Sequence, residues 1–217
     1  MKSILRALQY GRLIRNVYTK RFVKYGRQPA GIFWSNEQRQ VSRFKIILDQ
    51  ILFVRPKGSV SIADVGCGYG AMLRFIRENK AYSRLIYSGY DINPTLIKAC
   101  KSDARLTSRH FHIGDRPVNS VDFSVMSGTY NMAVTSNVDD WEEYFLGCLE
   151  SCWKYSRRGM VFNLLSSEKS HISDGSLYYA NVKRIRGYCK INFGVTRVIR
   201  EPHLPSDATF MVTRDWY

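Results

Sequence analysis

Apolar and polar residues follow two different periods along this chain. From Asn36 to Phe53 the apolar residues recur every three or four positions, which predicts an amphipathic helix with Ser35 as its N-cap. Beyond it, short apolar runs typical of buried strands alternate with segments of helical period as far as about residue 165. The predicted strands cover 58–65, 84–91, 109–115, 121–127 and 159–166, and the predicted helices between them cover 71–80, 94–100 and 141–156.

This alternation predicts one α/β domain with a doubly wound, mostly parallel sheet. Successive strands joined through helices need crossover connections, and these place helices on both faces of the sheet. After residue 166 we expect a polar loop to about Tyr178 and then a short helix over 182–192. Two final runs, 194–201 and 208–214, are close enough in sequence to predict a terminal antiparallel hairpin.

The first 35 residues have a different charge from the rest. No acidic residue precedes Glu37, so this span carries more than half of the formal net charge of +15, through Lys2, Arg6, Arg12, Arg15, Lys20, Arg21, Lys24 and Arg27. Apolar residues from Ile4 to Tyr18 recur at helical spacing, so we expect a basic helical arm or lid over 1–35 and the main domain over 36–217.

A basic helix of this kind can contact nucleic acid, an acidic protein or an anionic membrane. A helix packed on its own domain is favoured over one that lies on a membrane surface. No apolar run approaches transmembrane length, and five cysteines without a CxxC pair indicate reduced thiols and a cytoplasmic protein. The oligomeric state stays open.

The stretch SIADVGCGYG, residues 61–70, is the first candidate site. Its glycines satisfy both the dinucleotide pattern G-x-G-x-x-G/A and the G-x-G-x-G pattern of proteins that bind S-adenosylmethionine (SAM), so they cannot decide between the two ligands. Asp64 favours the second. A carboxylate at the end of the first strand would repel a pyrophosphate, whereas it suits the ammonium group of a methionine moiety.

Two more acids end the next two predicted strands. Asp91 is placed to accept both hydroxyls of a ribose, and Asp115 adds an acceptor where an adenine amino group would lie. Because the carboxyl ends of parallel strands meet at one edge of a sheet, Asp64, Asp91 and Asp115 are predicted to outline one crevice.

The segments ADVGCGYG, GYDINP, FHIGD and VDFSVMSGTYN together resemble the successive motifs of class I SAM-dependent methyltransferases. The resemblance implies a seven-stranded sheet of order 3-2-1-4-5-7-6 that ends in the antiparallel hairpin. It also implies roles for individual residues: backbone approach to the methionine part at Gly66, Gly68 and Gly70, ribose at Asp91, adenine at Ile92 and Asp115, the sulfonium at Ser127, and closure over SAM by Trp34. Three further segments are similar to small stand-alone bacterial methyltransferases of undefined substrate: YGRQPAGIFWSNEQRQVSRF, SGTYN and LYYA.

The function predicted from this likeness is in-line transfer of the SAM methyl group to an oxygen or nitrogen of a small or medium-sized metabolite, with S-adenosylhomocysteine (SAH) as product. A general base is needed only where the acceptor carries a proton. His171, Tyr130 and Tyr179 are the candidates for that role or for lining the acceptor side, and no metal site is expected. Two alternatives stay open: an RNA methyltransferase whose basic arm holds phosphates, and a binding protein without catalysis.

Overall fold

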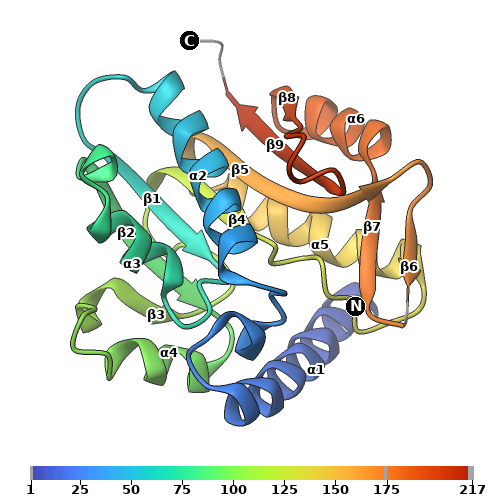
Figure 1. Cartoon of the computed structure of the whole chain (residues 1–217). Coiled ribbons are helices and arrows are strands. Elements are labelled where there is room, and N and C mark those ends of the chain that lie inside the picture. Colours follow the sequence, from blue (N-terminus) through green and yellow to red (C-terminus); the bar gives the residue numbers. More distant parts are fainter. Residues whose placement is uncertain (1, 174, 215–217) are drawn as a thin grey trace.

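The computed structural model describes residues 2–173 and 175–214, and the chain is drawn in Figure 1. Strands and helices alternate as expected through the first five strands. In chain order the elements are α1 (Lys2–Tyr25), the 3₁₀ turn η1 (Pro29–Ile32), α2 (Glu37–Val54), β1 (Val60–Val65), α3 (Ala71–Glu78), η2 (Lys80–Tyr82), β2 (Leu85–Asp91), α4 (Pro94–Lys101), η3 (Ser108–His110), β3 (Phe111–Ile113), β4 (Val121–Ser127), α5 (Val138–Trp153), β5 (Ser156–Ser167), β6 (His171–Ser173), β7 (Leu177–Asn181), α6 (Val182–Asn192), β8 (Val195–Ile199) and β9 (Asp207–Thr213).

The sheet confirms the predicted α/β class. Strands β3, β2, β1, β4 and β5 lie side by side and parallel, β9 pairs antiparallel with β5, and β8 pairs antiparallel with β9. If the two strands between β5 and α6 are set aside, this is the order 3-2-1-4-5-7-6 with its terminal hairpin. The carboxyl ends of β1, β2 and β4 therefore meet at one edge of the sheet.

The segment after β5 corrects the prediction of a polar loop. Strand β6 (His171–Ser173) pairs antiparallel with β7 (Leu177–Asn181), and β7 pairs in parallel with the far end of β5 (Leu165 with Tyr179). The physical reason is a period of two in this segment, since Tyr178 and Ala180 are buried whereas their neighbours are half-buried. The sheet thus contains nine strands where seven were expected.

The start of α2 also differs by one residue from the prediction. The N-cap is Asn36, whose side chain accepts a hydrogen bond from the backbone N–H of Arg39 at 2.8 Å, and Ser35 lies before it. Asparagine and serine are both favoured at this position, so the sequence alone could not choose between two adjacent caps.

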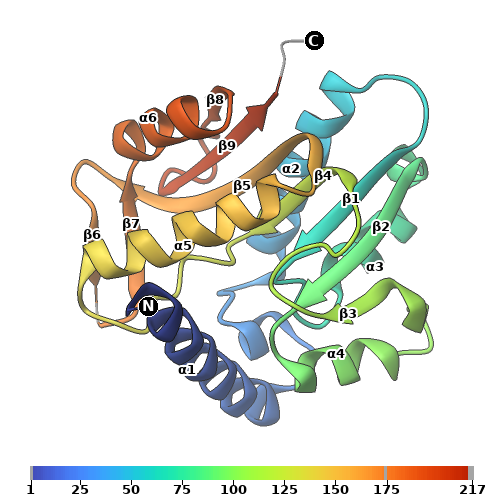
Figure 2. The ribbon, with the colours of Figure 1, turned by 180° about the vertical axis from the view of Figure 1, so that it is seen from behind.

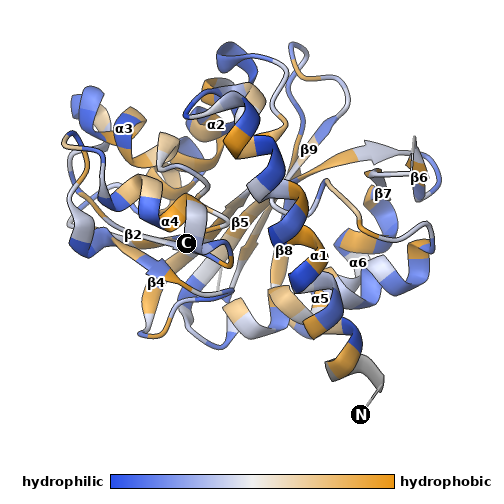
Figure 3. Ribbon diagram, turned by 90° about the horizontal axis from the view of Figure 1, so that it is seen from below, coloured by the Kyte–Doolittle hydropathy of each residue, from blue (hydrophilic) through white to orange (hydrophobic). Residues whose placement is uncertain are grey.

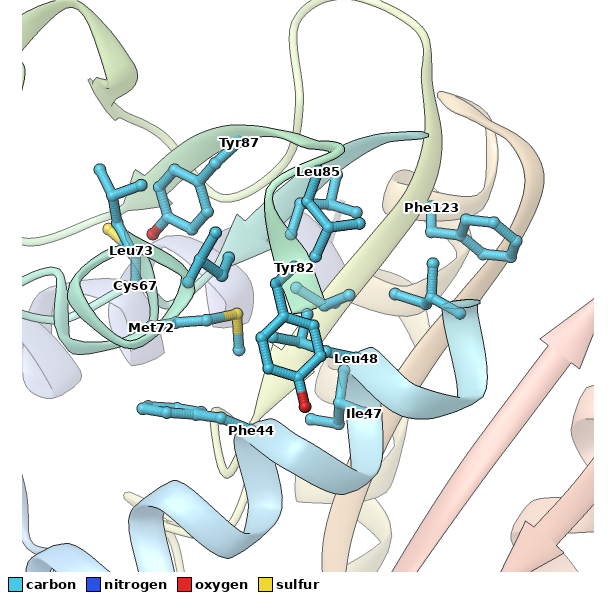
Figure 4. Packing of buried hydrophobic residues seen from close by; sticks show 14 of the residues in the cluster. Phe44, Ile47, Leu48, Cys67, Met72, Leu73, Tyr82, Leu85, Tyr87 and Phe123 are labelled. Carbon is cyan, nitrogen blue, oxygen red and sulfur yellow. The ribbon is translucent and has the colours of Figure 1, made fainter. Parts of the chain in front are cut away.

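Two hydrophobic cores lie on opposite faces of the sheet. One lies beneath α2, α3 and α4, and Figure 4 shows Phe44, Met72, Leu73, Tyr82 and Phe123 among its members. The other lies beneath α5, α6 and α1, and the largest fully buried side chain, Trp141, belongs to it. Figures 1 and 2 show the two helical layers from opposite sides.

The basic arm is a helix that packs on the domain. In both views α1 runs below the sheet, from the region of α5 and the β6–β7 hairpin to α4 (Figures 1 and 2). Tyr10 is buried against Trp141 and Tyr144, and the Arg6 guanidinium forms an ion pair with Asp140 at 2.7 Å. The arm therefore packs on its own domain, as the sequence analysis favoured over a helix that lies on a membrane. Its role as a lid stays a prediction. In the part of the chain that is described, no helix combines the length and apolar character needed to cross a membrane.

If α1 belongs to the core, its buried aromatic anchor must contribute to global stability. We expect Tyr10→Ala to lower the free energy of unfolding by about 2–4 kcal/mol, because a large buried side chain is lost. Leu8→Ala is the matched control on the same helix: Leu8 is 67% exposed, so its loss should change stability by less than about 0.5 kcal/mol. Urea unfolding followed by circular dichroism measures both, and equal small effects would show that the helix is not part of the cooperative core.

Candidate functional site

A cavity lies at the carboxyl edge of the sheet, covered by α1 and by the segment that leads into α2. Its lining includes nine residues that the sequence analysis singled out: Trp34, Asp64, Gly66, Gly68, Asp91, Ile92, Asp115, Ser127 and Tyr130. The structure thus brings together segments that lie up to 96 positions apart in the sequence. Gly70 does not line the cavity but is the N-cap of α3 in a left-handed conformation, φ 82°, against the side chains of Leu106 and Phe111.

The loop between β1 and α3 turns sharply beneath this cavity. Gly66 and Gly68 both have positive φ, 78° and 58°, which residues with a side chain rarely adopt. A Cβ on Gly66 would lie 2.6 Å from the side chain of Thr129, so this position also requires glycine for space. The N–H groups of Gly66 and Cys67 both donate to the Tyr90 carbonyl, which fixes the loop to the end of β2.

Asp91 holds the glycine loop from the side of β2. One carboxylate oxygen accepts from the backbone N–H of Gly68 at 3.0 Å, and the other accepts from the N–H of Asn93 at 2.8 Å. Burial raises the pKa of Asp91 to about 6, and these two hydrogen bonds limit the rise. Each oxygen has a second lone pair, so the carboxylate can still accept hydroxyl groups from a ligand.

Asp64 is a second buried acid on the same wall. Its carboxylate accepts a hydrogen bond from the Tyr87 hydroxyl at 2.8 Å. Burial raises the pKa of Asp64 to about 7, the hydrogen bond opposes that rise, and the negative charge of Asp91 adds to it. Two carboxylates that repel each other in a buried cavity make a cationic ligand favourable there.

Asp115 differs in its surroundings from the other two acids. It borders the cavity two residues beyond the end of β3, but its side chain is 54% exposed and pairs with the adjacent Arg116 at 2.8 Å. Ile92 and Asn93 line the cavity between Asp91 and α4. Among the described residues that line the cavity, three are acidic and none is lysine, arginine or histidine.

The end of β4 forms the opposite wall. The Ser127 hydroxyl is buried there without a hydrogen-bond partner, so it is available to a ligand. Gly128 donates its N–H to the Asn163 side chain at 2.6 Å, and Thr129 donates its hydroxyl to the Val65 carbonyl at 2.8 Å. These bonds fix the SGTYN segment to the ends of β5 and β1.

Trp34 covers this wall and is held from behind by a buried ion pair. The Arg43 guanidinium lies 4.4 Å from the centre of the Trp34 ring, and it pairs with Asp207 at the start of β9. Both charged side chains are more than nine-tenths buried, so burial lowers the pKa of Arg43 and raises that of Asp207. Arg39 also approaches Asp207, at 3.7 Å.

The three catalytic candidates do not share one place. Tyr130 lines the cavity, but burial raises the pKa of its phenol well above the ordinary value, which makes it a poor base at neutral pH. His171 and Tyr179 face each other across the β6–β7 hairpin, with their rings stacked at 4.9 Å, and neither lines the cavity. The geometry therefore gives the predicted catalytic role of His171 and Tyr179 no support.

Several cavity residues escaped the sequence analysis. Ile14 and Tyr18 reach it from α1, and Gln40 and Phe44 reach it from α2. The sequence showed only that these residues belong to two helices. The residues around them do not indicate which part of the domain each helix packs against. Burial together with the nearby Asp91 charge raises the pKa of Tyr18. Within the described residues, no group of three or more His, Cys, Asp or Glu side chains is placed to hold a metal ion.

Comparison with known proteins gives one significant curated relative. No family model matches the chain. A protein of Mycobacterium tuberculosis (strain ATCC 25618 / H37Rv) named "Putative methyltransferase Rv1506c" is 32% identical over 134 residues, which are 60% of this chain and 78% of that protein.

Three solved structures with the same fold are distant in sequence. Magnesium protoporphyrin IX methyltransferase from Synechocystis PCC 6803 with bound SAH aligns with a TM-score of 0.61 at 12% identity, over 99% of this chain and all of that one. The 1,6-didemethyltoxoflavin-N1-methyltransferase of Burkholderia thailandensis gives the same TM-score and identity over 96% and 90% of the two chains. An amino pentose methyltransferase of Micromonospora echinaspora with bound SAM gives 0.58 at 15% identity, over 81% and 92%.

The raised pKa of Asp64 has a consequence for stability without any ligand. Since its pKa in the fold lies above the ordinary value of 3.8, the stability associated with its neutral form is lost as the pH rises from about 4 to about 7. We expect Asp64→Asn to raise the free energy of unfolding by about 1–3 kcal/mol at pH 8, and by progressively less towards pH 4.

Urea unfolding of the unliganded protein at several pH values measures this gain. Asp139→Asn is the control, because the Asp139 side chain is 86% exposed and should show no such pH dependence. A loss of stability in Asp64→Asn at every pH would mean that the Asp64 carboxylate is stabilised, not strained, in the fold.

Proposed function

This chain belongs to the class I SAM-dependent methyltransferases, and we propose that it methylates an oxygen or nitrogen atom of a small or medium-sized metabolite. The observation that carries the choice of ligand is the charge of the cavity lining: three acids and no basic side chain among the described residues, in a chain of net charge +15. SAM carries positive charge on its sulfonium and ammonium groups, whereas a dinucleotide carries a negative pyrophosphate. The cavity therefore fits SAM.

In this proposal the residues at the strand ends divide the donor among them. Asp91 accepts the ribose hydroxyls, and Asp64 faces the ammonium group. Gly66 and Gly68 let the backbone approach the methionine part, since both have positive φ and a Cβ on Gly66 would overlap the Thr129 side chain. At the adenine end, Ile92 packs on the base and Asp115 accepts from its amino group. Ser127, whose hydroxyl has no partner in the protein, lies by the sulfonium.

When bound, SAM would supply an electrophilic methyl group. The sulfur would keep the electron pair of the carbon–sulfur bond, and a lone pair of the acceptor would form the new bond to the methyl carbon. The task of the protein is then alignment and exclusion of water. Ile14 and Tyr18 of α1, together with Trp34, cover the cavity for this purpose. Tyr130 orients the acceptor, and a proton released from the acceptor passes to water. His171 and Tyr179 are given no part in proton transfer.

The choice of a small acceptor over RNA is supported by two observations. The names of the structural neighbours describe small or medium-sized substrates, such as magnesium protoporphyrin IX and an amino pentose. In addition, part of the basic charge of the arm is used within the fold. Arg6 pairs with Glu143, Arg21 donates to the Ala30 carbonyl, and Arg27 donates to the Ala99 carbonyl. A cytoplasmic location remains a prediction.

The assignment of Asp91 is tested by binding alone. We expect Asp91→Ala to weaken SAM binding at least about 100-fold, because the variant loses two acceptors for the ribose and the bond that fixes Gly68. Isothermal titration calorimetry with SAM measures this, and Asp139→Ala should bind like the wild type. If Asp91→Ala kept full affinity, the residue assignment would be wrong. If the wild type bound no SAM, the non-catalytic alternative would gain support.

The acceptor class is tested by following a labelled methyl group. The purified protein is incubated with methyl-labelled SAM and, separately, with the small-molecule filtrate and the RNA fraction of one bacterial extract. We expect label to pass to the filtrate only. Label in RNA, lost steeply as salt is added, would instead support the RNA alternative, since phosphate contacts weaken with ionic strength.

A further inference from the structure

A second hollow, which we name the apolar groove, lies on the outer side of α1 beside the donor cavity. Its volume is about 300 Å³, at the lower end of the range for small-molecule sites. Four segments form its walls: α1, the residue that follows η1, the loop after β4 and the residues just before β7. The described residues that line it are Leu13, Val17, Phe33, Met132, Ala133, Val134, Gly175 and Ser176.

The apolar groove and the donor cavity are lined by neighbouring residues of the same segments. On α1, Ile14 and Tyr18 face the cavity, and the adjacent Leu13 and Val17 face the groove. Phe33 lies between two cavity residues, Ile32 and Trp34, and Tyr130 of the cavity is followed after one residue by Met132 of the groove. A ligand in the groove would therefore lie against the same segments that enclose the methyl donor.

Phe33 is the C-cap residue of η1, where its N–H donates to the Ala30 carbonyl at 3.3 Å, and its backbone conformation is unusual. Among the described residues it is the one non-glycine with positive φ, at φ 65° and ψ 18°. Such a conformation costs about 1 kcal/mol or more and is concentrated at ligand clamps and active sites. The ring nevertheless stays 39% exposed at the groove, held by an edge contact with Tyr18 at 5.3 Å and by the Arg21 guanidinium at 4.6 Å.

The chemistry of the lining selects the ligand. No described residue of the groove carries a charge, so a charged group held there would lose hydration without gaining a partner. Leu13 and Val17 are both more than one third exposed, which leaves apolar surface to be covered. Figure 3, viewed from below, shows that hydrophobic and hydrophilic residues alternate along α1.

Resting on the proposed function, we propose that the apolar groove binds the ring body of a neutral, largely apolar acceptor. The acceptor is thus an aromatic or alicyclic metabolite whose hydroxyl or amino group points towards Trp34 and Tyr130. Sugars, nucleotides and charged amino acids do not fit this lining. The groove selects the acceptor, while the acids of the neighbouring cavity hold the donor.

The test uses the wild-type protein saturated with SAH and four probes: 2-naphthol and indole as neutral rings, and 2-naphthalenesulfonate and adenosine monophosphate as charged ones. Ligand-observed NMR and calorimetry measure their binding. We expect the neutral rings to bind and the charged probes to bind at least about tenfold more weakly, because no described lining residue carries a charge and the nearby Arg21 is engaged by the Ala30 carbonyl and the Tyr25 and Phe33 rings.

Leu13→Asp places a charge in the groove, so 2-naphthol should bind at least about tenfold more weakly while SAH affinity stays within about twofold. Leu8→Asp, on the same helix but outside the groove, is the matched control and should bind both like the wild type. Phe33→Gly is a second variant that suits the positive φ, so it should fold at least as well and still lose 2-naphthol binding.

The outcomes separate the two levels of the proposal. Absence of SAH binding in the wild type would overturn the proposed function itself. Two outcomes with normal SAH binding would overturn the groove alone. In one, the wild type does not bind 2-naphthol; in the other, the wild type, Leu13→Asp and Phe33→Gly bind it equally. Equal binding of neutral and charged probes would overturn the substrate class.

Discussion

Two carboxylates buried in one cavity without a compensating cation form the constraint on which the site depends. Asp64 and Asp91 end adjacent parallel strands, so the topology of the sheet forces them together, and burial raises the pKa of both. A protein with a large excess of lysine and arginine could have neutralised them easily. Since the charged residues described in the lining are all acidic, the burial that raises the pKa of these carboxyl groups favours a cationic ligand.

Asp91 links this electrostatic feature to the backbone. Its hydrogen bonds from Gly68 and Asn93 join the loop after β1 to the start of α4, so the residue proposed to contact the ligand also shapes the surface beneath it. Thr129 reaches the same loop from the β4 side and leaves no space for a Cβ on Gly66. The donor site is therefore built from bonds among three strand ends, with little reliance on flexible surface side chains.

That the proposed donor residues line one cavity was predictable because their determinants are local. A glycine that needs positive φ and an acid at the end of an apolar run are visible within ten residues of sequence. The short apolar runs themselves predicted the first five strands. The β6–β7 hairpin was missed because its alternation is short and polar. The Arg43–Asp207 pair and the apolar groove were missed because each depends on contacts between distant segments. His171 and Tyr179 were chosen because their side chains can transfer protons, but the type of side chain does not determine where a residue lies in the fold.

The position of Asp207 has a consequence for how the chain acquires its shape. It begins β9, the last strand that the structure describes, and β9 lies between β5 and β8 in the interior of the sheet. The anchor behind Trp34 therefore cannot form on the ribosome until nearly all of the described chain has been synthesised. Until then the edge of β5 stays unpaired along most of its length, exposed to association with other nascent chains. Because β9 follows every other described strand in the chain, the anchor behind Trp34 is completed after the rest of the described sheet.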